Sequence, residues 1–92
     1  MCAVDDPIVF RLSLFSIPER LSSGQWLQIQ TQCPQMRPKY RWSMDGPGHM
    51  ETDNNRCLFT FNNNSSHDIA LVRCTILFEG LQLTHQWYVM RS

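Results

Sequence analysis

Apolar and polar residues alternate along most of this chain with a period of two, which is the pattern of half-buried β-strands. In residues 27–33, for example, three glutamines alternate with Leu27, Ile29, Thr31 and Cys33. One face of this stretch is therefore mostly apolar, and the other is solvated. Similar stretches occur at residues 8–14, 40–44 and 57–61. The pattern predicts an all-β chain without an amphipathic helix.

Turn-forming residues separate these stretches. Pro18 breaks the first of them, Ser-Ser-Gly at 22–24 then turns the chain, and Pro34 and Pro38 bracket a short loop. Asp-Gly-Pro-Gly at 45–48 is the densest turn signal in the chain. From there to Arg56 the sequence is polar, and we expect a loop or a weak edge strand.

The clearest hairpin lies near the C-terminus, where a two-residue turn at Glu79-Gly80 sorts both flanking strands. On one face the opposing pairs are Phe78 with Leu81, Ile76 with Leu83, Cys74 with His85, Val72 with Trp87, and Ala70 with Val89. All but the third pair are apolar, whereas the opposite face is mostly polar. A shift of one residue would destroy this sorting, so the sequence predicts the register as well as the strands.

Length and charge limit the possible classes. At 92 residues, the chain is expected to form one domain, residues 1–92, with one small core. Its net charge is zero, whereas nucleic-acid-binding proteins carry a basic surface. The basic cluster at Arg37, Lys39 and Arg41 is short, and eight acidic residues offset it. We therefore expect no nucleic-acid partner.

Membrane and secretion signals do not appear in the sequence. No window approaches the roughly 20 apolar residues of a membrane span. The first residues lack the basic and apolar regions of a signal peptide. If the protein is secreted, we expect this chain to be an ectodomain fragment, tied to a membrane only through a segment outside it.

The four cysteines, Cys2, Cys33, Cys57 and Cys74, permit three sets of pairings. Their number and spacing leave disulfides and free thiols equally open. No two of them form a C-x-x-C pair, and zinc ligands normally come in tight local pairs, so no metal is expected. His85, opposite Cys74 in the hairpin, is expected to pack there with one nitrogen hydrogen-bonded.

The sequence lacks the usual catalytic motifs. There is no Gly-x-Ser-x-Gly elbow, Gly-rich phosphate loop or pair of inward carboxylates, so we expect no enzymatic activity and no cofactor. His67 and Asp68 are adjacent. The simpler role for Asp68 is to close a loop by pairing with an arginine or by accepting backbone N–H bonds.

Five residues carry a family resemblance. In order, they are Cys33, Trp42 and an Asp-x-Ala-x-x-x-Cys frame from Asp68 to Cys74. This order resembles an immunoglobulin-like domain, which implies a seven-stranded antiparallel β-sandwich. The resemblance also implies a Cys33–Cys74 disulfide between the sheets, a structural core that includes Trp42, Asp68 and Trp87, and an extracellular or cell-surface location.

The chain departs from typical members of this family. Val72 stands where they have a tyrosine that pins the preceding loop. Cys33 and Trp42 are close together, and the span from Trp42 to Cys74 is too short for a variable-type domain. The nearest subtype is constant-like or C2-like. Residues 40–46 also resemble, more distantly, part of a PKD-type sandwich.

A second disulfide and N-glycosylation would both require the extracellular location that the resemblance implies. A second disulfide, Cys2–Cys57, is possible only if the N-terminal segment folds across the end of the sandwich. Asn63 and Asn64 begin overlapping N-glycosylation acceptors in the loop expected before Asp68.

The function expected from the resemblance is protein recognition by one module of a cell-surface receptor or adhesion protein. Its partner would be a protein ligand or co-receptor, and self-association stays open. The alternatives are a structural spacer and a PKD-like accessory sandwich that contacts carbohydrate. A contiguous apolar patch on the sheet of strands C, F and G favours binding. An evenly polar face favours a spacer, and an aromatic platform with neighbouring amides favours sugar.

The expected binding face follows from the strand alternation. The residues predicted to point away from the core on this sheet are Lys39, Arg41, Leu71, Arg73, Leu77 and Tyr88. Tyrosine and arginine are enriched in binding hot spots, and outward leucines are not needed for folding. The loop 34–38 is expected at the end of this face. Trp26, outward beside glutamines, is expected to pack under a neighbouring loop.

Overall fold

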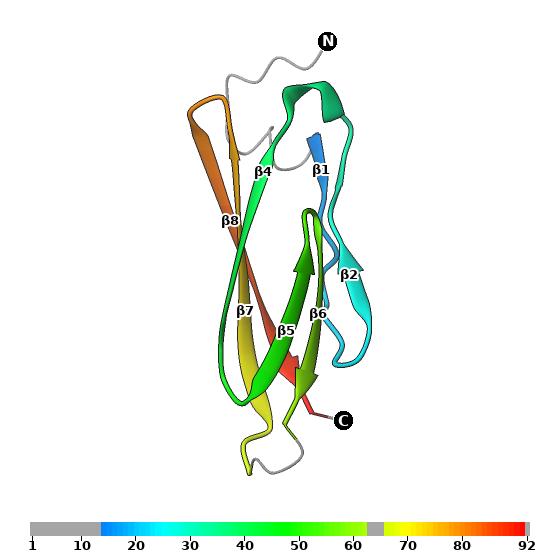
Figure 1. The fold of residues 1–92 in the computed structure, drawn as a ribbon, viewed down its shortest axis with the longest axis vertical. Helices are drawn as coiled ribbons and strands as arrows, with labels where there is room; N and C mark the ends of the chain where they lie inside the picture. Colours follow the sequence, from blue (N-terminus) through cyan, green and yellow to red (C-terminus); the bar gives the residue numbers. More distant parts are fainter. Residues whose placement is uncertain (1–13, 63–65, 92) are drawn as a thin grey trace.

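The computed structural model describes residues 14–62 and 66–91, and these form β-strands and one short 3-10 turn (Figure 1). The elements are β1 (Phe15–Ser16), β2 (Trp26–Gln28), β3 (Gln30–Thr31), η1 (Pro34–Met36), β4 (Lys39–Asp45), β5 (Gly48–Asp53), β6 (Arg56–Phe61), β7 (Ile69–Phe78) and β8 (Leu81–Met90). The predicted all-β class is confirmed.

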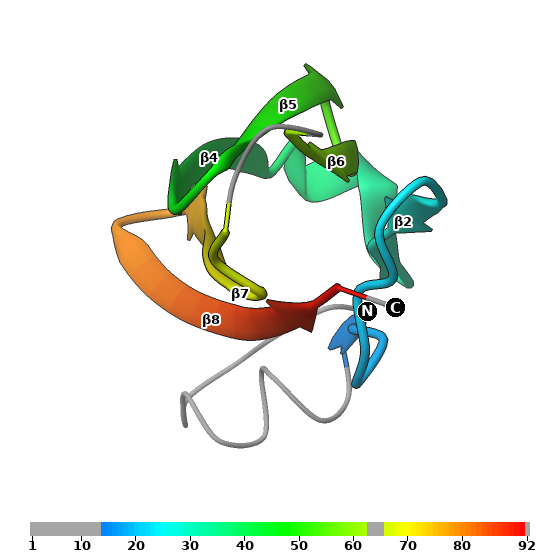
Figure 2. The same ribbon diagram turned by 90° about the horizontal axis from the view of Figure 1, so that it is seen from below.

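The strands form three antiparallel sheets. One has the order β2-β6-β5, a second has the order β4-β7-β8, and a small third sheet pairs β1 with β3. Viewed along the long axis, the strands surround a common interior, with β6 and β7 on opposite sides of it (Figure 2). The described residues thus form eight strands in three sheets, where the sequence predicted seven in two.

The additional strand arises from a break within residues 27–33. Ile29 lies between β2 and β3, and its backbone bonds to Asn55 rather than to a regular ladder partner. Its N–H donates to the Asn55 carbonyl at 2.8 Å, and its carbonyl accepts from the Asn55 side-chain amide at 2.6 Å. The predicted alternation is nevertheless confirmed, because Leu27, Ile29 and Cys33 are all buried.

The polar stretch after residue 48 forms β5, a regular edge strand paired with β6 along its whole length. Gly48 begins this strand against Phe59. A Cβ at Gly48 would run into the Phe59 ring and lie 2.7 Å from the Thr60 carbonyl oxygen. A glycine is therefore required for this close approach of β5 to β6.

The β7–β8 hairpin has the register that the sequence predicts. Val72 pairs with Trp87 and Cys74 with His85, and the turn falls at Glu79-Gly80. Glu79 and Gly80 have φ values of 47° and 76°, as a primed hairpin turn requires. The long hairpin follows from this turn and from the alternation on either side of it.

The core lies between the two three-stranded sheets. Its fully buried members include Ile29 and Phe59 on one side and Val72, Ile76 and Val89 on the other. Trp87 is 2% exposed, as predicted, whereas Trp42 is only partly buried at the margin of this core. The assignment of Asp68 to the structural core is wrong, because its side chain lies at the surface.

Candidate functional site

The outer face of the β4-β7-β8 sheet carries all six residues predicted to form a binding surface. In β7 the even-numbered residues Val72, Cys74 and Ile76 are buried, so the odd-numbered ones point outward. In β8, Trp87 and Val89 are buried, so the even-numbered neighbours point outward in this half. The predicted inward and outward assignment is confirmed for both strands, while binding by this face stays a prediction.

One part of this face is a contiguous apolar surface, here called the apolar block, made of Ile69, Leu71, Tyr88 and Met90. Ile69 pairs directly with Met90, and Leu71 pairs with Tyr88. Ile69 is 48% exposed, Tyr88 64% and Met90 63%, while Leu71 is half-buried between them and β4. Sequence reasoning missed Ile69 and Met90, although extending the hairpin register by one pair finds both.

A clamp just beyond the apolar block fixes the ends of its two strands. Arg91 donates its backbone N–H to the Asp68 carbonyl at 2.8 Å, and its guanidinium lies 3.3 Å from the Asp68 carboxylate. The same guanidinium donates to the carbonyl oxygens of His67 and Asn62 and lies 4.6 Å from the centre of the Phe61 ring. The predicted pairing of Asp68 with an arginine is thus confirmed.

Beyond the apolar block, the outer face of this sheet carries more basic than acidic side chains. Lys39, Arg41 and Arg73 are exposed there, and Asp45, which pairs with Leu71, is the one outward carboxylate on the three strands of this sheet. Arg73 donates a hydrogen bond to the Gln86 side-chain oxygen at 3.3 Å, which holds it across β7 and β8. Arg73 is the cation next to the apolar block, whereas Arg41 and Lys39 lie further along the sheet, opposite Thr75 and Leu77.

Two hollows border the apolar block. A dimple of about 110 Å³ lies among Ser43, Asp45, Leu71 and Arg73. A larger hollow of about 490 Å³ runs from Tyr88 and Met90 to the segment 20–25 beside them. The block is therefore flanked by concave surface on two sides.

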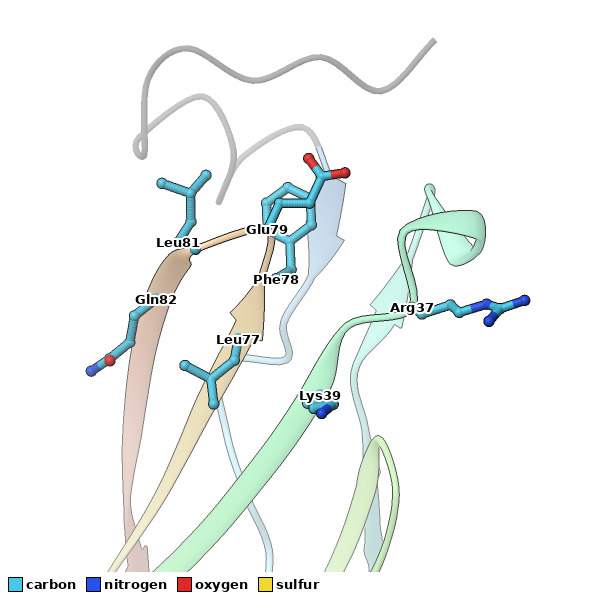
Figure 3. Close-up of a pocket in the computed structure, with 8 residues that line it drawn as sticks. Arg37, Lys39, Leu77, Phe78, Glu79, Leu81 and Gln82 are labelled. Carbon is cyan, nitrogen blue, oxygen red and sulfur yellow. The ribbon is translucent and has the colours of Figure 1, made fainter.

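A third hollow, of about 300 Å³, lies at the other end of the sheet, next to the Glu79-Gly80 turn (Figure 3). Lys39 and Leu77 line it, as does Arg37, whose φ is 53°. Figure 3 shows the Arg37 side chain pointing away from Leu77. Because the charged groups do not converge there, this hollow is a weaker candidate than the apolar block.

The predicted disulfides are not formed. Cys57 and Cys74 are free, buried thiols, which rules out both the Cys33–Cys74 and the Cys2–Cys57 bridge in this structure. Cys33 lies beyond the end of β3, next to η1, whereas Cys74 lies in the middle of β7, so the assumed pairing joined different levels of the molecule. Cys2 lies outside the described residues.

Burial controls the chemistry of these thiols. It raises the pKa of Cys57 to about 11. Burial, and then the nearby charge of Cys57, raise the pKa of Cys74 to about 12. Burial also raises the pKa of Tyr40, with a further contribution from Cys74. Both thiols are therefore protonated at neutral pH and unreactive in the folded protein.

The remaining predicted positions lie away from this face. Trp26 is outward, as predicted, at 47% exposure, and the Arg56 guanidinium covers its ring at 4.7 Å. The side chain that covers this tryptophan thus belongs to the neighbouring strand β6. Asn63 and Asn64 lie outside the described residues, so their glycosylation stays a prediction.

Other chemistries have less support in the geometry. Within the described ranges, no three His, Cys, Asp or Glu side chains gather into a group that could hold a metal ion. His67 and Asp68 are both exposed, and His85 packs edge-on to Trp87 with ring centres 4.6 Å apart. The part of the chain that the structure describes contains no helix long and apolar enough to cross a membrane.

Comparisons with protein-family models, with curated proteins and with solved structures gave no match to this chain. Its site is therefore interpreted from its own geometry. The features that define the site are the apolar block, Arg73 beside it, the cations further along the same face and the two flanking hollows.

Proposed function

We propose that this chain is an immunoglobulin-like extracellular module that recognises a protein partner, as part of a cell-surface receptor or adhesion protein. The strand order supports this fold assignment. If β2 and β3 are one strand interrupted at Ile29, then β1, β2/β3, β6 and β5 correspond to A, B, E and D, and β4, β7 and β8 to C, F and G. This is the arrangement of a constant-type domain.

The observation that carries the proposed function is the exposure of the apolar block. Single exposed apolar residues are ordinary, but Ile69, Tyr88 and Met90 are all about half or more exposed and adjoin one another on paired strands. A spacer domain has no need of such a surface. Tyr88 and nearby Arg73 are also of the residue types that dominate binding energies in protein interfaces.

The charge along the outer face of this sheet indicates the chemistry of the partner. Lys39, Arg41 and Arg73 outnumber the single outward carboxylate, Asp45, on the strands of this sheet. Opposite charges across an interface speed association and exclude unsuitable partners. The proposed partner surface therefore has an apolar part that meets the block and, on one side of it, acidic groups that meet Arg73 and the cations further along the sheet.

The test is a binding screen in which the purified, multimerised domain probes an array of extracellular protein domains. For each protein bound, Tyr88→Ala and Arg73→Ala should each weaken binding by at least about fivefold, or about 1 kcal/mol, without loss of the fold. Trp26→Ala, on the other sheet, is the matched control and should leave the affinity unchanged. Binding that survives both face variants, or no binding at all, would overturn the proposal.

A carbohydrate ligand is the second candidate, because Tyr88 lies two residues from the exposed amide of Gln86 on the same face. An aromatic ring next to an amide is suited to stacking on and hydrogen bonding with a sugar. Probing a glycan array with the same protein separates the two candidates. Sugar binding that depends on Tyr88 and Gln86 but not on Arg73 would favour this second function.

A further inference from the structure

Two thiols in the core have no part in the proposed binding face. Cys57 lies on β6, the central strand of the β2-β6-β5 sheet, and Cys74 lies on β7, the central strand of the β4-β7-β8 sheet. Both are free and 0% exposed, and both belong to the single core cluster between these sheets. Figure 2 shows β6 and β7 on opposite sides of the interior, so the two buried cysteines belong to the same core and come from opposite sheets.

Neighbouring contacts place the two cysteines at the same level of the molecule. Trp42, the strand partner of Cys74, donates its indole N–H to the Asn54 carbonyl at 2.8 Å. Asn54 belongs to the turn of the β5–β6 hairpin, three residues before Cys57. The charge of Cys57 also raises the pKa of Cys74, as expected of two groups close together in a dry interior.

From this geometry we propose that Cys57 and Cys74 are a redox pair, which forms a disulfide between the two sheets when the chain folds under oxidising conditions. Packed sheets lie about 10 Å apart, and disulfide-bonded cysteines have Cα atoms about 4.4–6.8 Å apart, so the sheets approach each other locally as the bond forms. The proposal does not depend on the proposed binding function.

The chemistry is thiol–disulfide exchange with a small disulfide such as oxidised glutathione. One cysteine thiolate attacks the glutathione disulfide, which gives a mixed disulfide and releases one glutathione thiolate. The second cysteine thiolate then attacks the protein sulfur of the mixed disulfide and releases the second glutathione thiolate. The protein loses two protons and two electrons, and one oxidised glutathione becomes two reduced ones.

Burial decides when this reaction occurs. Exchange requires a thiolate that the reagent reaches, and in the folded protein both thiols are protonated and have no exposed surface. The unfolded chain meets both requirements. The redox state is therefore set while the chain folds and is then held by the closed core, so that it reflects the compartment in which folding took place.

The experiment refolds the denatured full chain from denaturant, either with mixed oxidised and reduced glutathione or with excess reductant. After acid quenching and alkylation, mass mapping should find a Cys57–Cys74 cross-linked peptide only in the oxidised sample. Folded, reduced protein in the same glutathione mixture should acquire this cross-link at least tenfold more slowly. If the cross-link forms equally fast from folded and unfolded protein, the closed core does not hold the redox state. If the folded protein from the oxidised sample carries the alkylating group on Cys57 or Cys74, these two cysteines are not a pair.

A variant removes the other two cysteines, including Cys33, which is disulfide-bonded in this structure. In Cys2→Ala/Cys33→Ala, Cys57 and Cys74 are the only cysteines, and oxidative refolding should still join them. The cross-linked form should have an unfolding equilibrium constant on the order of 100-fold smaller than its reduced form, because the bridge restricts the unfolded chain. If this variant folds and stays fully reduced in the oxidised mixture, the pairing is wrong. If it does not fold, mass mapping of the unaltered chain decides.

Discussion

The indole rings of Trp42 and Trp87 stack with their centres 6.0 Å apart and their planes 19° apart. Trp42 lies on β4 and Trp87 on β8, so the rings meet on the inner side of the intervening strand β7. Each also bonds away from its own sheet, Trp42 to the Asn54 carbonyl at 2.8 Å and Trp87 to the Pro18 carbonyl at 2.7 Å. The pair therefore ties this sheet to the segments outside it that contain Asn54 and Pro18.

Replacing Trp87 by phenylalanine should destabilise the protein more than the same change at Trp42. Trp87→Phe leaves a cavity in the core and removes the donor to the partly buried Pro18, so we expect a loss of about 2–3 kcal/mol. Trp42→Phe removes a donor to the exposed Asn54, whose carbonyl water can solvate, so we expect a loss of about 1 kcal/mol. Denaturant unfolding measures both losses, and equal losses would contradict the stated roles of the two rings.

Alkaline pH should destabilise the reduced protein through its two buried thiols. The pKa values of Cys57 and Cys74 are raised from 9.0 to about 11 and 12 in the folded state. Between pH 9 and 10, the unfolded chain has therefore lost protons that the folded chain retains. With fewer protons on the unfolded state, the free energy of unfolding falls as pH rises, by up to about 1.4 kcal/mol per pH unit for each thiol.

The control for this effect is the Cys57→Ala/Cys74→Ala double variant, measured with reductant present. Its baseline stability will differ, so the comparison is between slopes and not between absolute values. Groups that titrate in both proteins cancel in that comparison. If the free energy of unfolding falls with the same slope in both proteins between pH 9 and 10, the folded protein does not hold these thiols protonated.

Two glycines should respond to alanine for different reasons. At Gly48 the added Cβ meets the buried Phe59 ring and the Thr60 backbone, so Gly48→Ala should cost about 1–3 kcal/mol by overpacking. At Gly80 the added Cβ has open space, but φ is +76°, so Gly80→Ala should cost about 1 kcal/mol of backbone strain. Thermal or denaturant unfolding measures both losses of stability. A Gly48→Ala variant as stable as the unaltered protein would contradict the close approach of β5 to β6.

Strand alternation was enough to predict most of the fold. The β7–β8 register followed from one turn assignment because a hairpin of two ten-residue strands with one buried face admits a single sorting. The break at Ile29 was not predictable in this way, since it depends on hydrogen bonds to Asn55, which lies 26 residues further along the chain. The strand β5 was underestimated because its stability comes from pairing with β6 rather than from its own polar sequence.

The cysteine pairing failed for a related reason. The order of Cys33, Trp42 and Cys74 resembles that of an immunoglobulin-like domain. This order does not tell at which height along the strands each residue lies. Cys57 shares the strand alternation of Phe59 and Phe61 and points into the core from the sheet opposite Cys74. Only the three-dimensional arrangement shows that Cys57, and not Cys33, is the cysteine that faces the core opposite Cys74.

The Arg91 clamp offers the last prediction, because it holds the strand ends that carry the apolar block. Arg91→Ala removes the hydrogen bonds to His67 and Asn62 and the contact with the Phe61 ring, so we expect a loss of about 1–2 kcal/mol. Asp68→Asn removes only an exposed ion pair and should cost less than about 1 kcal/mol.

Hydrogen exchange distinguishes local from global effects of the clamp. In Arg91→Ala, the amides of the strand ends at Ile69 and Met90 should exchange faster than in Asp68→Asn, while those near the Glu79-Gly80 turn should change less, because that end of the hairpin has its own turn. Uniform acceleration along both strands would show that Arg91 stabilises the whole domain. Unchanged exchange at Ile69 and Met90 would show that the apolar block is held by strand pairing alone.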